Sequence, residues 1–247
     1  MQHLVGILGF NNQARVDKCV ASVLADLPPD SRVVLVDNGV NPLKAPPGCE
    51  YMPVNFQTHG GFTAALRLFL CDALAGDYAT ATFLNDDLAL EPGCLRAMIE
   101  KAQEQGVGLA FPMQVDMYNP QVIICGGTGA AYPAGIHKVG QRGVVPAPQE
   151  DVRWMPFAAV TLSMRAVEDV GLPDPNMTIW FSDSDYCLRA RLQGWRIISL
   201  GETAVVRHEH SAAVKEMQED TRRHAFEADQ TAFARKWGGG LLAEYST

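Results

Sequence analysis

Short runs of apolar and β-branched residues alternate with longer amphipathic segments over the first 110 residues. The short runs predict strands at residues 4–10, 32–36, 51–54, 79–84 and 107–111. Apolar residues spaced three and four apart predict helices at 13–27, 62–74 and 92–105. This alternation predicts an α/β fold in which helices cover both faces of a mostly parallel, Rossmann-like sheet.

Two of the predicted strands end in polar turns, Asp37-Asn38-Gly39 and Asn85-Asp86-Asp87. In open sheets of this class, ligands bind beyond the carboxyl ends of the strands. Adjacent carboxylates repel each other unless a cation or hydrogen-bond donors lie nearby. Asp86 and Asp87 therefore predict a site for Mg²⁺ or Mn²⁺, which bind diphosphate oxygens as well. The alternative is a solvated turn.

The second half of the chain has a different character. Glycine and proline are frequent from 113 to 151, which predicts a loop-rich stretch, and residues 126–143 could form a lid. Helices are expected at 165–170, 183–193 and 211–237, and strands at 196–199 and 204–207. No repeat or linker divides the chain, so we expect one domain over 1–247, with a nucleotide-binding half to about 112 and an acceptor-side half from about 113.

Two polar clusters in this half could carry chemistry. Ser182 and Asp185 have the spacing of a capping box at a helix start, and Asp183 between them could act as a general base. Capping alone is an equally good interpretation. His208 and His210 would point to opposite faces of an extended segment, so at most one of them joins a given site, and a structural role is the alternative.

Bulk composition limits the partners. A net charge of −8 argues against a nucleic-acid binder. No apolar run is long enough to span a bilayer, no signal peptide is indicated, and the six cysteines are scattered. These features predict a cytoplasmic protein, with any membrane association peripheral at the inner face. They leave a homodimer open.

The order of these motifs along the chain resembles the family-2 inverting glycosyltransferases of the GT-A fold. The rhamnosyltransferase-like branch is the most similar. The block Phe181-Ser182-Asp183-Ser184-Asp185-Tyr186-Cys187-Leu188-Arg189, with its Gly194-Trp195 tail, is the most specific part. The similarity extends from Val5 to about Trp237.

The resemblance implies transfer of a sugar from a UDP- or dTDP-sugar to a hydroxyl of a glycan, a lipid-linked sugar or another acceptor, with Mg²⁺ or Mn²⁺ as cofactor. It also implies roles for particular positions. Asp183 is the implied general base, and Asp87 and His208 are the implied metal ligands. The implied donor-binding residues are Phe10, Asn11, Asp37, Asn38, Arg67, Asn85 and Asp86, and the implied acceptor-side residues are Trp154, Trp180 and Asp185.

The sequence departs from the family pattern at three places. Asn85 stands in place of the first aspartate of a strict DxD motif, Ser182 stands where many members have glutamate, and Leu66-Arg67 stand where the branch often has paired asparagines. Two other functions compete with this interpretation. A sugar nucleotidyltransferase would need clustered basic residues in its first loop, where only Arg15 occurs, and a non-catalytic sugar-nucleotide or glycan-binding module would tolerate loss of Asp87 or Asp183.

Overall fold

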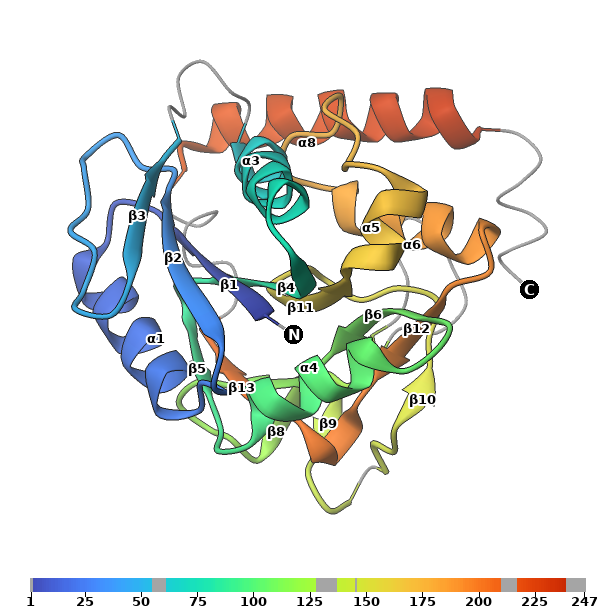
Figure 1. Ribbon diagram of the computed structural model, residues 1–247. Helices are drawn as coiled ribbons and strands as arrows, with labels where there is room; N and C mark the ends of the chain where they lie inside the picture. The colour runs from blue at the N-terminus through green and yellow to red at the C-terminus, as the bar shows by residue number, and fades with distance from the viewer. Residues whose placement is uncertain (1, 55–60, 128–136, 145, 210–216, 239–247) are drawn as a thin grey trace.

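The computed structural model describes residues 2–54, 61–127, 137–144, 146–209 and 217–238 (Figure 1). The larger sheet has the strand order β10-β12-β6-β11-β4-β1-β2-β3. Its strands are β1 (Gln2–Gly9), β2 (Ser31–Asp37), β3 (Glu50–Pro53), β4 (Tyr78–Asn85), β6 (Val107–Phe111), β10 (Glu150–Asp151), β11 (Ala159–Ser163) and β12 (Arg196–Ser199). Most neighbours pair in parallel, whereas β11 and β10 run antiparallel to theirs. The predicted α/β fold is therefore confirmed.

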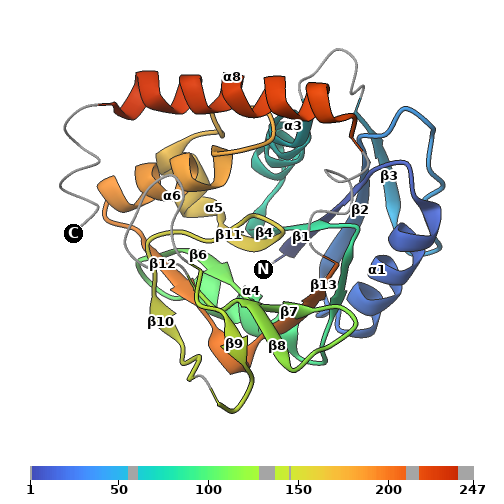
Figure 2. The same cartoon turned by 180° about the vertical axis from the view of Figure 1, so that it is seen from behind.

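Alternate residues of the central strands face two separate cores. Leu4 and Leu8 of β1 pack into the core under α3 (Gly61–Ala75), α5 (Met164–Val170) and α6 (Ser182–Leu192). Val5 and Ile7 face the opposite core, under α1 (Gln13–Ala25) and α4 (Cys94–Gln103). Burial on both faces explains why these strands are continuous apolar runs in the sequence. Figures 1 and 2 show the two helical layers from opposite sides.

Helix α3 lies very close to β1 because of one glycine. A Cβ atom on Gly6 would lie 2.5 Å from a ring carbon of Phe69, which is nearer than a methyl group can approach. The Phe69 ring fills that space and also packs at 5.2 Å, centroid to centroid, against Phe83 of β4. The apolar stripe predicted for residues 62–74 is largely this core-facing side of α3, although Leu74 is exposed.

The stretch 113–151, which the sequence predicts to be rich in loops, also contains strands. It contributes β7 (Met113–Asp116), β8 (Val122–Cys125) and β9 (Gly140–Gln141) to a second sheet, with β5 (Leu88–Leu90) and β13 (Val205–His208), in the order β5-β13-β7-β8-β9. These strands are short and interrupted by glycine and proline, so they carry no clear period in the sequence. Strand β11 was also not predicted. Residues 128–136 and 145, in or next to the predicted lid, lie outside the described residues.

The chain's last described helix, α8 (Glu219–Trp237), runs along one side of the molecule next to α3 and α6 (Figures 1 and 2). It begins later than the predicted 211–237, and residues 210–216 are not described. Within the described part of the chain, no helix combines the length and apolarity that crossing a membrane requires.

Candidate functional site

Parallel pairing brings the polar strand ends together at one edge of the larger sheet. Gly9 at the end of β1 pairs with Asp37, and Leu8 pairs with Asn85. The backbone beyond β4 continues this contact, because Asp86 N–H donates to Leu8 O at 3.1 Å. The turns after β1, β2 and β4 are therefore neighbours, as the sequence predicted for a ligand site.

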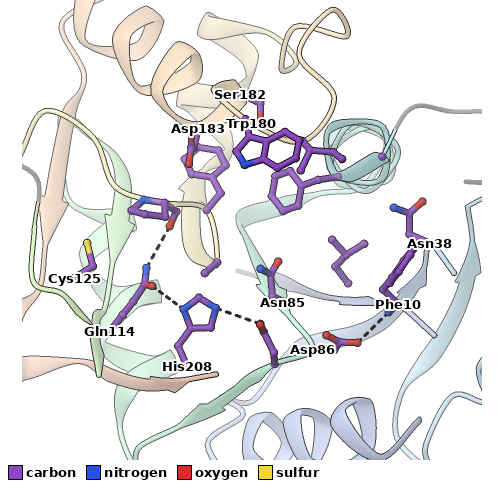
Figure 3. Close-up of a pocket in the computed structure, with 18 of the residues that line it drawn as sticks. Phe10, Asn38, Asn85, Asp86, Gln114, Cys125, Trp180, Ser182, Asp183 and His208 are labelled. Atoms are coloured by element: carbon purple, nitrogen blue, oxygen red, sulfur yellow. Dashed lines mark hydrogen bonds and ion pairs between the residues drawn. The ribbon is translucent and has the colours of Figure 1, made fainter. Parts of the chain in front are cut away.

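A cavity of about 260 Å³ lies at this edge, between the two sheets and the start of α6 (Figure 3). Trp180, Ser182 and Asp183 lie across the pocket from Asp86 and His208, and Asn85 lies between the two groups. Its described lining consists of Leu8, Phe10, Asn38, Gly61, Phe62, Asn85, Asp86, Asp87, Gln114, Ile124, Cys125, His137, Pro156, Phe157, Ala158, Ile179, Trp180, Ser182, Asp183, His208 and Met217.

Asp87 and His208 form one end of the cavity. His208 Nε2 lies 3.3 Å from Asp87 Oδ1, and both side chains are buried. Antiparallel pairing of β13 with β5, in which His208 faces Leu88, brings the end of β13 next to the acidic turn. Glu209 N–H then donates to Asp87 O at 3.0 Å, so the backbone fixes this approach.

Gln114 sets the orientation of the histidine ring. Its Oε1 lies 3.0 Å from His208 Nδ1, and its Nε2 donates to Pro156 O at 3.4 Å. Because the amide nitrogen is used as a donor, Oε1 faces the ring as an acceptor and Nδ1 carries the proton. His208 Nε2 is then the ring nitrogen that faces Asp87, which is how a metal-binding imidazole is usually held.

These residues fit a divalent metal ion with two protein ligands. Among the described residues, no group of three or more histidine, cysteine, aspartate or glutamate side chains could hold a metal. One carboxylate and one imidazole nitrogen are nevertheless a usual protein contribution where substrate phosphates and waters complete the coordination.

The charges of the residues that line the cavity also favour a divalent cation. Its described lining carries the carboxylates Asp86, Asp87 and Asp183 and contains neither lysine nor arginine. A diphosphate entering such a lining would meet repulsion from like charges. A divalent cation between the carboxylates and the phosphates would reverse the sign of that interaction.

The floor of the cavity is polar, and some of its polar groups already make hydrogen bonds within the protein. Asp86 Oδ2 accepts a hydrogen bond from Phe10 N–H at 3.0 Å, which ties the turn after β4 to the turn after β1. Asn38 Oδ1 and Asn85 Oδ1 are both buried and have no hydrogen-bond partner among the described residues. Buried polar atoms of this kind are normally satisfied, so these two oxygens are available to donors on a ligand.

Asp183 occupies the opposite wall, in the first turn of α6. Burial raises the pKa of its carboxyl group to about 6, because a buried carboxylate loses hydration; the backbone N–H groups of Ser184, Asp183 and Phe157 oppose this shift. One of these bonds runs from Ser184 N–H to Asp183 Oδ1 at 2.7 Å. A carboxylate with such a pKa is ionised at neutral pH and basic enough to accept a proton from a substrate hydroxyl.

The backbone just before Asp183 is strained. Phe181 has φ of 63°, in the left-handed region that a bulky side chain rarely adopts, and it immediately precedes α6. Strain of this kind persists only where the surrounding structure holds it, and it is frequent at functional sites. The conformation directs Trp180 and Ser182 into the cavity on either side of Phe181.

Five predicted site residues do not line the cavity, and four of them have clear structural partners elsewhere. Asp37 accepts hydrogen bonds from Gly39 N–H, Leu43 N–H and the Tyr51 hydroxyl. Asn11 Oδ1 accepts from Val40 N–H and Asn41 N–H, so both residues shape the turns after β1 and β2. Arg67, on α3, donates a hydrogen bond to Pro173 O. Trp154 is buried in the core, where its ring meets that of His137 edge to face.

Asp185 also lies outside the cavity, and the predicted capping box is wrong. The residue preceding α6 is Phe181, and no side chain caps this helix. Asp185 is completely buried and accepts hydrogen bonds from Arg189 Nε at 3.0 Å and Trp237 Nε1 at 2.8 Å, with Lys236 Nζ at 2.8 Å. It anchors α8 to α6, and only the tertiary structure brings these partners to it.

Several lining residues were not predicted from the sequence. Gln114, His137, Phe157 and Ile179 come from segments read as loop or left unassigned, and nothing in their local sequence marks them as site residues. His210, the other candidate metal ligand, lies outside the described residues.

Comparisons with known proteins agree with this geometry. Residues 5–120, somewhat less than half of the chain, match the family model described as Glycosyl transferase family 2. Sequence comparison with curated proteins gives no significant match. The family match extends over the turns that carry Phe10, Asn38 and Asp87 and stops before the segment that carries Asp183.

Solved structures share the fold. A crystal structure of GalNAc-T7 with UDP, GalNAc and Mn²⁺ superposes with a TM-score of 0.64 at 12% identity, over 84% of this chain and 43% of that one. S. aureus TarS gives 0.56 at 10% identity, over 95% of this chain and 44% of that one, and its 1–349 form gives 0.55 at 11% identity, over 96% and 74%. The chain thus spans less than half of the first two proteins. The fold is that of the GT-A glycosyltransferases, and these findings support a glycosyltransferase.

We expect Asp185→Asn to destabilise the protein without affecting nucleotide binding. An amide would turn an N–H group toward buried donors, leave Arg189 without its carboxylate partner and leave Lys236 with Asp174 alone, at a cost of about 2–4 kcal/mol. Urea unfolding measures the loss. Asp220→Asn, an exposed aspartate that pairs with Arg223 on the surface of α8, is the control and should change little. Equal stability of the two variants would contradict the anchoring role.

Proposed function

We propose that this protein is a metal-dependent inverting glycosyltransferase that moves a sugar from a UDP- or dTDP-sugar to an acceptor hydroxyl. The observation that carries this proposal is the placement of an Asp87–His208 pair and a basic carboxylate, Asp183, on opposite walls of one cavity. The family-2 match and the shared GT-A fold support it.

In this proposal the donor lies along the carboxyl ends of β1, β2 and β4. The base and ribose lie near Phe10 and Asn38, in turns shaped by Asp37 and Asn11, and the diphosphate lies near Asp86 and Asp87. A bound Mg²⁺ or Mn²⁺ would neutralise charge that develops on the diphosphate as it leaves. Mn²⁺ is the better match, because Mg²⁺ prefers a shell of oxygen ligands and His208 offers nitrogen.

Asp183 would take the proton from the acceptor hydroxyl as that oxygen attacks the anomeric carbon from the face opposite the diphosphate. One displacement inverts the configuration once, and no covalent bond to the protein is needed. Burial tunes this carboxylate for the role, since a base works best with a pKa near the working pH. The acceptor side is the half of the cavity formed by the second half of the chain, with Trp180, Phe157 and Ile179 as its apolar wall.

The described residues give the two competing functions less support. A nucleotidyltransferase must hold a triphosphate, and the described lining has no cationic side chain for that task. A binding module has no need to bury a carboxylate at a cost in stability, yet Asp183 is held in that state.

Removing the metal ligand should abolish metal-dependent nucleotide binding. We expect Asp87→Ala to lose at least about tenfold in UDP affinity with Mn²⁺ present, because loss of a supporting metal contact typically costs that much. Calorimetry with UDP, with and without Mn²⁺, measures this, and Asp77→Ala, an exposed aspartate, is the control. Equal Mn²⁺-dependent affinity in Asp87→Ala and wild type would rule out the assignment.

Removing the base should stop turnover and spare donor binding. We expect Asp183→Asn to turn over about 10²–10⁴-fold more slowly, the usual contribution of a positioned general base. Affinity for the donor should stay near wild type, since the donor contacts lie on other turns. Steady-state rates with a panel of UDP- and dTDP-sugars, and NMR of the product anomer, are the measurements. Near-normal turnover or a retained anomeric centre would contradict the mechanism.

The same variant should be more stable than wild type at high pH. A carboxyl group whose pKa is raised in the folded state stabilises that state fully below its unfolded pKa, and this contribution is lost as the pH rises through about 6. The substituted amide stays neutral at every pH, so Asp183→Asn should gain roughly 3 kcal/mol at pH 8 and little near pH 4. Urea unfolding at both pH values tests this. A variant that is less stable than wild type at pH 8 would contradict a raised pKa for the Asp183 carboxyl group in the folded protein.

A further inference from the structure

Helix α8 is attached to the wall of the cavity through one buried carboxylate. Asp229 is 1% exposed. Its Oδ1 accepts from Thr178 N–H at 2.8 Å and from the Thr178 hydroxyl at 3.1 Å. Its Oδ2 accepts from Ile179 N–H at 2.8 Å and from Trp180 N–H at 2.9 Å. Three consecutive backbone amides therefore converge on one side chain.

Residues 178–180 belong to no helix or strand, so their amides have no ladder partners of their own. Buried N–H groups must be satisfied, and an ionised carboxylate is a strong acceptor for them. The other side of this segment is fixed as well, since Thr63 N–H donates to Thr178 O at 3.0 Å. Gly61 permits that contact, because a Cβ atom there would lie 2.9 Å from Thr178 O.

The segment held by Asp229 is the acceptor-side wall of the proposed site. Ile179 and Trp180 line the cavity, and Asp183 follows in the next turn of chain (Figure 3). Helix α8 also supports this wall with aromatic rings. Phe226 meets Trp180 edge to face with centroids 5.6 Å apart, and Phe181 lies 5.8 Å from Phe233.

We propose that Asp229 is a positioning residue, which holds residues 178–181 so that Trp180 and the general base Asp183 face the donor. The role in turnover rests on the proposed function, whereas the structural coupling from Asp229 to the start of α6 does not. The strained backbone of Phe181 fits this role, because it lies between the segment that Asp229 binds and the helix that carries Asp183. Asp185 ties the end of α8 to the same helix through Trp237 and Lys236.

The test compares Asp229→Asn and Asp229→Ala with Asp220→Asn, an aspartate on the exposed side of the same helix. Asparagine keeps the volume and one acceptor oxygen but turns an N–H group toward the Thr178 or Trp180 amide, so a folded variant is available even if alanine is too disruptive. Hydrogen exchange by mass spectrometry is measured over residues 177–187. UDP affinity with Mn²⁺ is measured by calorimetry, and kcat and KM are measured for hydrolysis of the best UDP-sugar.

We expect faster exchange in both 178–180 and 182–185 for the Asp229 variants and no change for Asp220→Asn. UDP affinity and donor KM should stay within about twofold, while kcat falls about tenfold or more, since small misplacement of reacting groups is costly. Faster exchange confined to 178–180, or unchanged kcat in a variant with faster exchange, would overturn the positioning role. A wild-type protein that hydrolyses no donor would instead contradict the proposed function, and the exchange pattern would still decide whether Asp229 positions the start of α6.

Discussion

Parallel pairing of β1 with both β2 and β4 is the constraint on which the site depends. The pairs Gly9–Asp37 and Leu8–Asn85 place the ends of three strands at one edge, so the turns that follow them must share that edge. Gly6 lets α3 pack onto β1. Thr63, near the start of α3, then donates a backbone hydrogen bond to Thr178, in the segment that leads into α6. Both walls of the cavity are thus positioned relative to the same central strand.

The cavity is costly for the protein to maintain. Its described lining contains three carboxylates and no cationic side chain. The side-chain oxygens of Asn38 and Asn85 are buried without partners among the described residues, and the backbone of Phe181, next to the lining residues Trp180 and Ser182, is strained. Each of these features lowers stability, and each would be relieved or used by a bound ligand that brings positive charge and hydrogen-bond donors. Buried carboxylates outside the cavity have the opposite character, since Asp185 and Asp229 are fully engaged and hold the walls in place.

Much of the front half could be predicted from the sequence, because buried parallel strands and amphipathic helices leave strong periodic patterns. The acidic turn at Asp86-Asp87, the strand end at Asp37-Asn38 and the placement of Asp183 at a helix start follow from local residues. The second sheet could not be predicted in this way. Its strands have two to four residues, and their pairing depends on contacts with β13, far away in the sequence.

The positions of several other residues relative to the cavity could not be predicted from the sequence for a related reason. Ser182 and Asp185 have capping-box spacing, but Asp185 instead takes partners from Arg189 and from α8, which no local pattern reveals. Gln114 was missed because its importance arises only when β7 pairs with β13 and brings it to His208. Arg67 and Trp154 have suitable chemistry for a sugar site, yet their side chains are used in packing and hydrogen bonding away from the cavity.

The most direct test of the account is the position of manganese in a crystal of this protein grown with UDP and Mn²⁺. We expect an anomalous-scattering peak within ligand distance of both Asp87 Oδ1 and His208 Nε2, with the diphosphate on the cavity side of the ion and Asp183 on the far wall. UDP bound in the cavity with manganese at other residues, or with none at Asp87 and His208, would contradict it.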